Sequence, residues 1–208
     1  MYDVALFGHL IGVVVLISAV VMTVSGLVRA QRASTVSQIR IATGAVPLAD
    51  RLIPPAMLLV LGFGLYMVAR HGDDGSIAWD AGWLDVSLAI FAVMAVLGPA
   101  VETKRAKALW TAARAATGEA ITPQLDRLRR DPILTQVSMF GSCQLVAFLY
   151  LMSNKPALLG SLTAIGIAAL VSIILTRVGL HTAATRPGAT SLAPADLPQP
   201  AVPTRGPR

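Results

Sequence analysis

Residues 4–28 read VALFGHLIGVVVLISAVVMTVSGLV, and this stretch contains no Asp, Glu, Lys or Arg. It is long enough to cross the hydrocarbon core of a bilayer, which takes about 20 residues of apolar helix. A backbone inside lipid must pair its own N–H and C=O groups, so the stretch is predicted to be a helix. The preceding Met1-Tyr2-Asp3 has no basic residue, and we therefore interpret the stretch as an uncleaved membrane helix and not as a signal peptide.

Four further stretches of the same kind follow along the chain. Residues 52–69, 133–152 and 157–176 contain no charged side chain, and residues 83–101 contain one, Asp85. The composition agrees, with 55% hydrophobic and 13% charged residues and a mean hydropathy of +0.68. A soluble chain of 208 residues would need more charge. The sequence therefore predicts an all-α fold, a polytopic transmembrane helical bundle with five spans.

The basic residues predict the orientation, because Lys and Arg mark the cytoplasmic side of a membrane protein. Fifteen of the 17 basic residues fall in the first connection, the third connection or the tail, and the other two, Arg70 and Lys155, fall in the second and fourth connections. We expect the N-terminus outside and the C-terminus inside (N-out/C-in), in a multi-pass protein of the inner (plasma) membrane of a bacterium. The net charge of +6 follows this membrane rule, so we predict a lipid bilayer and no nucleic acid as its partner.

The chain is expected to divide into a transmembrane helical domain, residues 1–181, and a disordered cytoplasmic tail, residues 182–208, which is rich in proline. Within the first part, the cytoplasmic loop 102–131 is the largest connection between spans. Residues 104–116 favour a helix that Gly118 would end, and Thr122-Pro123 is typical of the start of another. The predicted helix 104–116 carries an apolar stripe of Leu109, Trp110, Ala113 and Ala116. This stripe indicates either that the helix lies on the inner leaflet or that it docks a partner.

Small residues recur every fourth position in two spans. Gly160, Ala164, Ala168 and Ser172 do so in the fifth span, and Gly8 and Gly12 in the first. Such spacing permits close approach of two helices, within the bundle or between subunits. A homo-oligomer or a partner membrane subunit is the corresponding expectation.

Few polar residues fall inside the spans, and an ionisable group there is a functional hypothesis. With the predicted orientation, His9, Asp85 and Gln144 all lie in the outer half of the membrane, which makes them candidates for one intramembrane polar cluster. Asp85 also suits the first turn of its helix, where the helix dipole favours a negative charge. His9 suits a haem iron or a soft metal, with haem b as the candidate cofactor, or a structural hydrogen bond.

Four short motifs resemble a large family of small bacterial integral membrane proteins. They are Tyr2-Asp-Val-Ala-Leu-Phe-Gly-His9-Leu-Ile-Gly12, Arg51-Leu-Ile-Pro with Leu61-Gly62-Phe-Gly64-Leu, Gly82-Trp83-Leu84 and Asn154-Lys155-Pro156. Their order along most of residues 1–177 is similar to that in predicted integral membrane proteins of unknown function. More distantly, the chain resembles the copper-resistance D (CopD) proteins and the HemJ-type protoporphyrinogen oxidases.

The HemJ resemblance implies two key residues, an early His and a Lys shortly after Trp-Leu in the third helix. His9 matches the first, but Ser87 stands at the position of the second, and Met-rich outer motifs of a copper importer are absent from the sequence. The resemblance thus implies the fold and a role for His9. Our leading hypothesis is a non-enzymatic membrane protein with an accessory or transport-related role. The alternatives are a haem-binding redox protein that uses His9, and a copper-handling protein.

Overall fold

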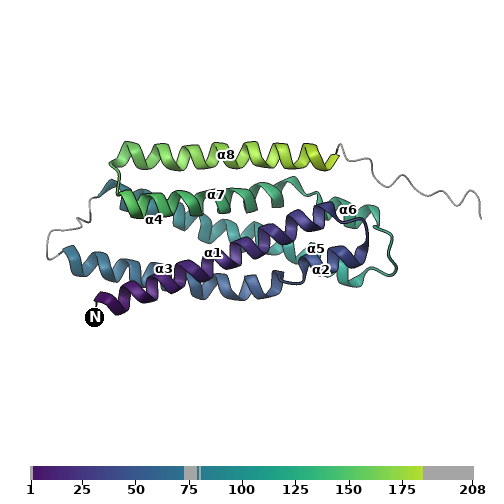
Figure 1. Ribbon diagram of the computed structural model, residues 1–208, viewed down its shortest axis with the longest axis horizontal. Coiled ribbons are helices and arrows are strands. Elements are labelled where there is room, and N and C mark those ends of the chain that lie inside the picture. The colour runs from purple at the N-terminus through teal and green to yellow at the C-terminus, as the bar shows by residue number, and fades with distance from the viewer. Residues whose placement is uncertain (1, 73–78, 80, 185–208) are drawn as a thin grey trace, which may run out of the picture.

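The computed structural model describes residues 2–72, 79 and 81–184, and Figure 1 shows them as a bundle of long helices that lie side by side. The described residues are almost entirely helical and contain no strand. Five helical segments are long and apolar enough to cross a membrane, which confirms the predicted all-α bundle with five spans. The elements in chain order are α1 Tyr2–Arg32, α2 Val36–Thr43, α3 Val46–Gly72, α4 Gly82–Leu97, η1 Gly98–Thr103, α5 Lys104–Ala115, α6 Pro123–Arg129, α7 Pro132–Asn154 and α8 Leu158–Ala184.

The helices are longer than the predicted spans. The segment α4–η1–α5 is continuous over 34 residues, about 51 Å at 1.5 Å per residue, against a hydrocarbon core of about 30 Å. The second span also begins earlier, since α3 starts at Val46 and contains Pro54 and Pro55 inside the helix. Pro47 lies in the first turn of α3, where a missing N–H is tolerated, whereas Pro54 and Pro55 lie within the helix.

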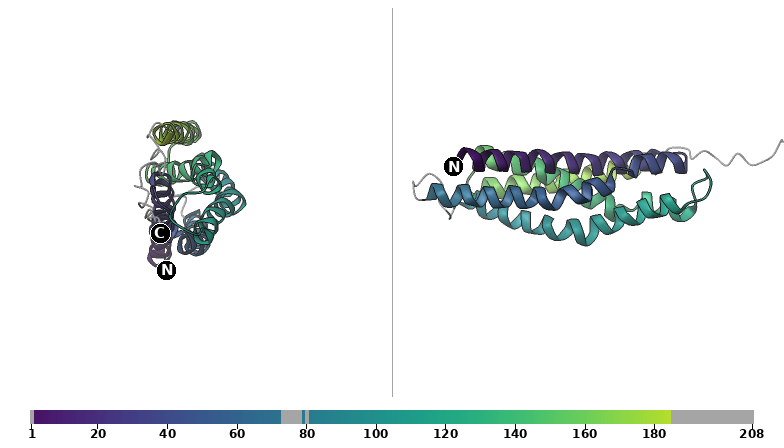
Figure 2. Two further views of the ribbon diagram at one scale, coloured as in Figure 1. Left: turned by 90° about the vertical axis from the view of Figure 1, so that its right-hand side faces the viewer. Right: turned by 90° about the horizontal axis from the view of Figure 1, so that it is seen from below.

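The bundle pairs its helices unequally. The antiparallel helices α1 and α3 share the most extensive contact, and α8 contacts mainly α7. Seen end-on, α8 lies at the outer edge of the bundle (Figure 2, left). Its buried positions are small or polar, including Ser161, Ala168 and Ser172, so the predicted small face does pack against a neighbour, although Gly160 is exposed.

One end of the bundle carries a compact group of helices, which we call the cap: α2, α5 and α6 with the adjacent ends of α1 and α7 (Figure 1). Its apolar core includes Ile39, Leu109 and Leu125. The apolar stripe of α5 contributes Leu109 and Ala113 to this core, and Ala116 packs against it. Thr122 accepts a hydrogen bond from the Leu125 N–H as the N-cap of α6, as its sequence predicts.

Polar contacts join the cap across its helices. The Arg129 guanidinium donates to the carbonyl oxygens of Ala30 and Ala33 near the end of α1 and pairs with Asp126. The Ser37 hydroxyl donates to Glu119 at 2.9 Å, and this bond, together with the Ser37 N–H, holds the pKa of the Glu119 carboxyl below its usual range. The cap is therefore a folded part of the bundle. Residues 185–208, most of the predicted disordered tail, lie outside the described residues, whereas residues 182–184 continue α8.

Candidate functional site

His9 lies between α1 and α3. Its side chain is buried, and Nδ1 lies 2.9 Å from the carbonyl oxygen of Val60. A carbonyl oxygen only accepts, so Nδ1 is the donor of this hydrogen bond, and in the corresponding tautomer of the ring the lone pair is on Nε2. The ring also lies against Gly64, where a Cβ would come within 3.3 Å of it. His9 is thus tied to α3 by one nitrogen while the other retains the chemistry of a ligand.

Gln144 and Asp85 have different surroundings from His9. Gln144 is fully buried between α7 and α8, where Nε2 donates to the carbonyl oxygen of Ile165 at 3.3 Å. Its Oε1 has no hydrogen-bond partner. Asp85 is exposed in the first turn of α4. No hydrogen bond or ion pair joins any two of these three residues, so the described part of the chain does not bring the predicted cluster together through direct contacts.

A partly open cavity of about 480 Å³ lies between the helices of the bundle, and its lining includes the exposed residues Leu58 and Leu149. It is lined by residues of α1, α3, α4, η1, α5 and α7, mostly apolar, and its volume is in the range of sites that hold small molecules. On α7 the lining runs from Ser138 to Met152, about 21 Å along the helix axis. His9, Asp85 and Gln144 are not among its lining residues. The cavity is therefore a site distinct from the residues that the sequence singled out.

Two carboxylates line the end of this cavity nearest the cap. Glu102 Oε1 accepts a hydrogen bond of 2.7 Å from the Ser138 hydroxyl, and Asp50 Oδ1 accepts one of 3.3 Å from the Thr103 hydroxyl. All four residues line the cavity. The second oxygen of each carboxylate has no hydrogen-bond partner among the described residues. The apolar cavity thus ends in acceptor groups with free capacity.

Local backbone geometry places Glu102 at this end. The π-helix η1 widens one turn of the α4–α5 helix between Gly98 and Thr103, and such turns are frequent at functional sites. The extra residue in the turn changes which side chains face the bundle beyond it. On α3, Asp50 lies four residues before Pro54, which has no N–H to donate to the Asp50 carbonyl oxygen. Both acidic residues therefore adjoin irregular turns of long helices.

Sequence reasoning missed this pair because charges were taken to mark the ends of the spans. Glu102 directly follows the uncharged run 86–101, and Asp50 is separated from the uncharged run 52–69 only by Arg51, so both were assigned to connections. The nearby Pro54-Pro55 and Gly98-Pro99 were the available signal, since proline inside a membrane helix frees backbone groups and often adjoins a cavity.

The fold and the cavity define a class of protein, a multi-pass helical membrane protein with an internal apolar site. Residues 4–156 match the sequence profile of a family described as "Predicted integral membrane protein (DUF2269)". The chain belongs to this family. Comparison with curated proteins and with solved structures gave no match. The matched residues include every residue that lines the cavity, whereas α8 falls outside the match.

Proposed function

We propose that this integral membrane protein binds a small, largely hydrophobic molecule in its internal cavity, in an accessory or transport-related role and without catalysing a reaction. The observation that carries the proposal is the cavity itself, a largely apolar space of about 480 Å³ between the helices of the bundle. An empty space of this size costs dispersion contacts along all of its walls. A bound molecule restores those contacts, and five helical elements and η1 hold the cavity open for it.

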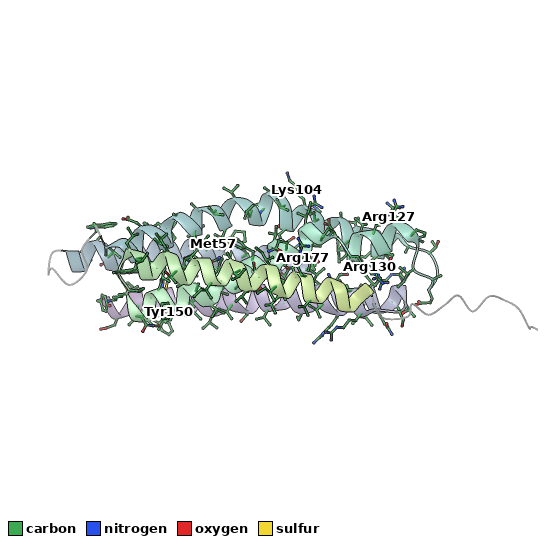
Figure 3. The ribbon with its side chains drawn as sticks, turned by 90° about the horizontal axis from the view of Figure 1, so that it is seen from above. Met57, Lys104, Arg127, Arg130, Tyr150 and Arg177 are labelled. Carbon is green, nitrogen blue, oxygen red and sulfur yellow. The ribbon has the colours of Figure 1, made fainter. Side chains whose placement is uncertain are left out.

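In this proposal the protein lies in the plasma membrane with its N-terminus outside and the cap in the cytoplasm. Lys104, Arg127, Arg130 and Arg177 lie in the half of the bundle that carries the cap, and Tyr150 lies in the other half (Figure 3). This partition supports the orientation through the preference of basic residues for the cytoplasmic side. The carboxylate end of the cavity then adjoins the inner surface of the membrane.

The proposal is tested by asking what the purified protein retains. Wild type, Leu145→Trp and Leu175→Trp are purified in lipid nanodiscs, and small molecules released by organic solvent are quantified by mass spectrometry. Leu145 lines the cavity, so tryptophan there fills it, whereas Leu175 is exposed on α8 and serves as a size-matched control. We expect a component retained by the wild type and the control and depleted in Leu145→Trp. Equal contents in all three proteins would contradict the proposal.

The second candidate is a haem or copper site at His9. The hydrogen bond from Nδ1 to the Val60 carbonyl favours it, because metal-ligating histidines commonly donate their other nitrogen to such an acceptor. The test is the absorbance spectrum and the metal content of protein from cells supplied with haem and copper. A Soret band or bound copper that both His9→Ala and His9→Gln abolish supports the site. Colourless, metal-free wild-type protein contradicts it.

A further inference from the structure

No basic side chain that the structure describes forms an ion pair with the carboxylates at the end of the cavity. Among the described residues, the ion pairs join Arg105 to Asp131 and Asp126 to Arg129 and Arg130. None involves Asp50 or Glu102. Lys107 acts electrostatically on Asp50, but its side chain is exposed and lies beyond the distance of an ion pair. Two acidic groups therefore share one end of a mostly apolar cavity, and no described basic side chain lies in ion-pair contact with either of them.

We propose that the molecule bound in the cavity is a cationic amphiphile, whose ammonium group lies between Glu102 and Asp50 and whose apolar tail runs along the cavity toward Phe148. This inference deepens the proposed function and rests on it. A buried charge is costly unless it is paired and hydrogen-bonded. An ammonium head supplies both the opposite charge and N–H or C–H donors to the oxygens that Ser138 and Thr103 leave free.

The walls of the cavity fit the tail of such a molecule. Met57, Met94 and Met152 line it with flexible thioethers, which adapt to an irregular chain. Phe91 and Phe148 meet edge to face, with ring centroids 6.3 Å apart, and both line the same space. An extended alkyl chain is the shape that follows the 21 Å or so of α7 between Ser138 and Met152.

Other head groups suit this end less well. A carboxylate or phosphate head would be repelled by Glu102 and Asp50, since like charges in a low-dielectric site cost several kcal/mol by Coulomb's law. A bare metal ion would meet only these two carboxylates, because no group of three His, Cys, Asp or Glu side chains in the described part of the chain is placed to hold one. The geometry thus favours an organic cation over both.

The experiment compares two probes that differ in the head group alone. Tritiated dodecyltrimethylammonium and tritiated dodecanol are titrated by scintillation proximity onto the full chain in neutral-lipid nanodiscs, with empty nanodiscs as the correction for partition into lipid. Wild type is compared with Glu102→Gln, Asp50→Asn and Asp3→Asn. Glutamine and asparagine keep an acceptor for Ser138 and Thr103, and Asp3 is an exposed carboxylate in the first turn of α1, outside the cavity.

We expect the ammonium probe to bind the wild type and Asp3→Asn equally, and Glu102→Gln about tenfold or more weakly, as for loss of a charge-assisted contact. Dodecanol should bind all four proteins alike. If both probes bind the wild type equally and Glu102→Gln and Asp50→Asn change nothing, the cation is refuted while the cavity site stands. If neither probe binds above empty nanodiscs, the inference and the proposed function fail together. Thermal unfolding of each variant, compared with wild type, confirms that a loss of binding does not reflect loss of fold.

Discussion

The Ser138 hydroxyl donates a hydrogen bond of 2.7 Å to Glu102 Oε1, and this bond joins the N-terminal part of α7 to the π-helix η1. Ser138 is 1% exposed, whereas Glu102 is half-buried at the wall of the cavity. The bond is the contact that holds the Glu102 carboxylate at the end of the cavity. A carboxylate with one bonded and one free oxygen is positioned for a ligand while part of its desolvation cost is already met.

Ser138→Ala should destabilise the protein by about 1.5–3 kcal/mol, because a half-buried carboxylate loses a hydrogen bond. The measurement is thermal or denaturant unfolding in detergent. Ser142→Ala is the matched control, one turn further along α7, since its hydroxyl donates only to the Ser138 carbonyl oxygen of its own helix. Equal, small effects of the two substitutions would show that the bond to Glu102 carries no stability.

Gly12→Leu should separate α1 from α3. A Cβ at Gly12 would lie 2.9 Å from Leu59 Cβ and 3.0 Å from the Val60 backbone nitrogen, and overpacking of this kind costs about 1–3 kcal/mol. Gly166→Leu places the same side chain on α8, where nothing lies within 4 Å of the added Cβ. The melting temperature in detergent should fall for the first variant and not for the second. A drop in both would indicate a general effect of leucine.

Arg129→Ala should loosen the cap. The guanidinium is 7% exposed and serves the carbonyl oxygens of Ala30 and Ala33, so its loss leaves buried acceptors unpaired at about 1.5–3 kcal/mol. Limited proteolysis of the segment between α5 and α7 should accelerate. Arg127 lies on an exposed face of the same short helix, so the protease should cleave the Arg127→Ala variant at the wild-type rate. Wild-type rates for both variants would contradict the role given to Arg129.

The proposed orientation is tested by reporters at two places. A reporter that is active only in the cytoplasm should give signal when fused after Arg208, and an extracytoplasmic reporter should give signal when inserted at Gly75, between α3 and α4. The reason is the partition of 15 of the 17 basic residues toward one side. Signals of the opposite kind at both places would reverse the bundle in the membrane and place the carboxylate end of the cavity outside.

Much of the fold was predictable because each membrane-spanning helix requires a long apolar stretch, which is visible in the sequence. Five apolar stretches, four of them uncharged, predicted five spans, and Gly118 and Thr122-Pro123 predicted the break between α5 and α6. Each of these signals is local, so no knowledge of the neighbouring helices was needed. Even the packing of Ala168 and Ser172 on α7 followed from their size alone.

The cavity was not predictable in this way. Whether Glu102 faces the bundle or the solvent depends on one extra residue in the turn η1, and no periodic pattern in the sequence reports a single π-helical turn. Asp50 lies inside α3 because that helix begins at Val46 and continues through two prolines, against the usual effect of proline on a helix. The hydrogen-bond partner of His9 is the backbone carbonyl oxygen of Val60. Every residue has such a group, so the sequence could not indicate which one His9 contacts.

The most direct test of the ligand-binding cavity is to find where a bound amphiphile lies. A dodecylammonium probe that carries a photoreactive diazirine in its chain is irradiated with the protein in nanodiscs, and the adducts are mapped by tandem mass spectrometry. We predict adducts concentrated on the cavity-lining stretches 91–95 of α4 and 145–152 of α7, and their suppression by excess unlabelled dodecyltrimethylammonium. Adducts spread equally over the exposed face of α8, at Leu170, Ile174 and Val178, with no suppression, would contradict the account.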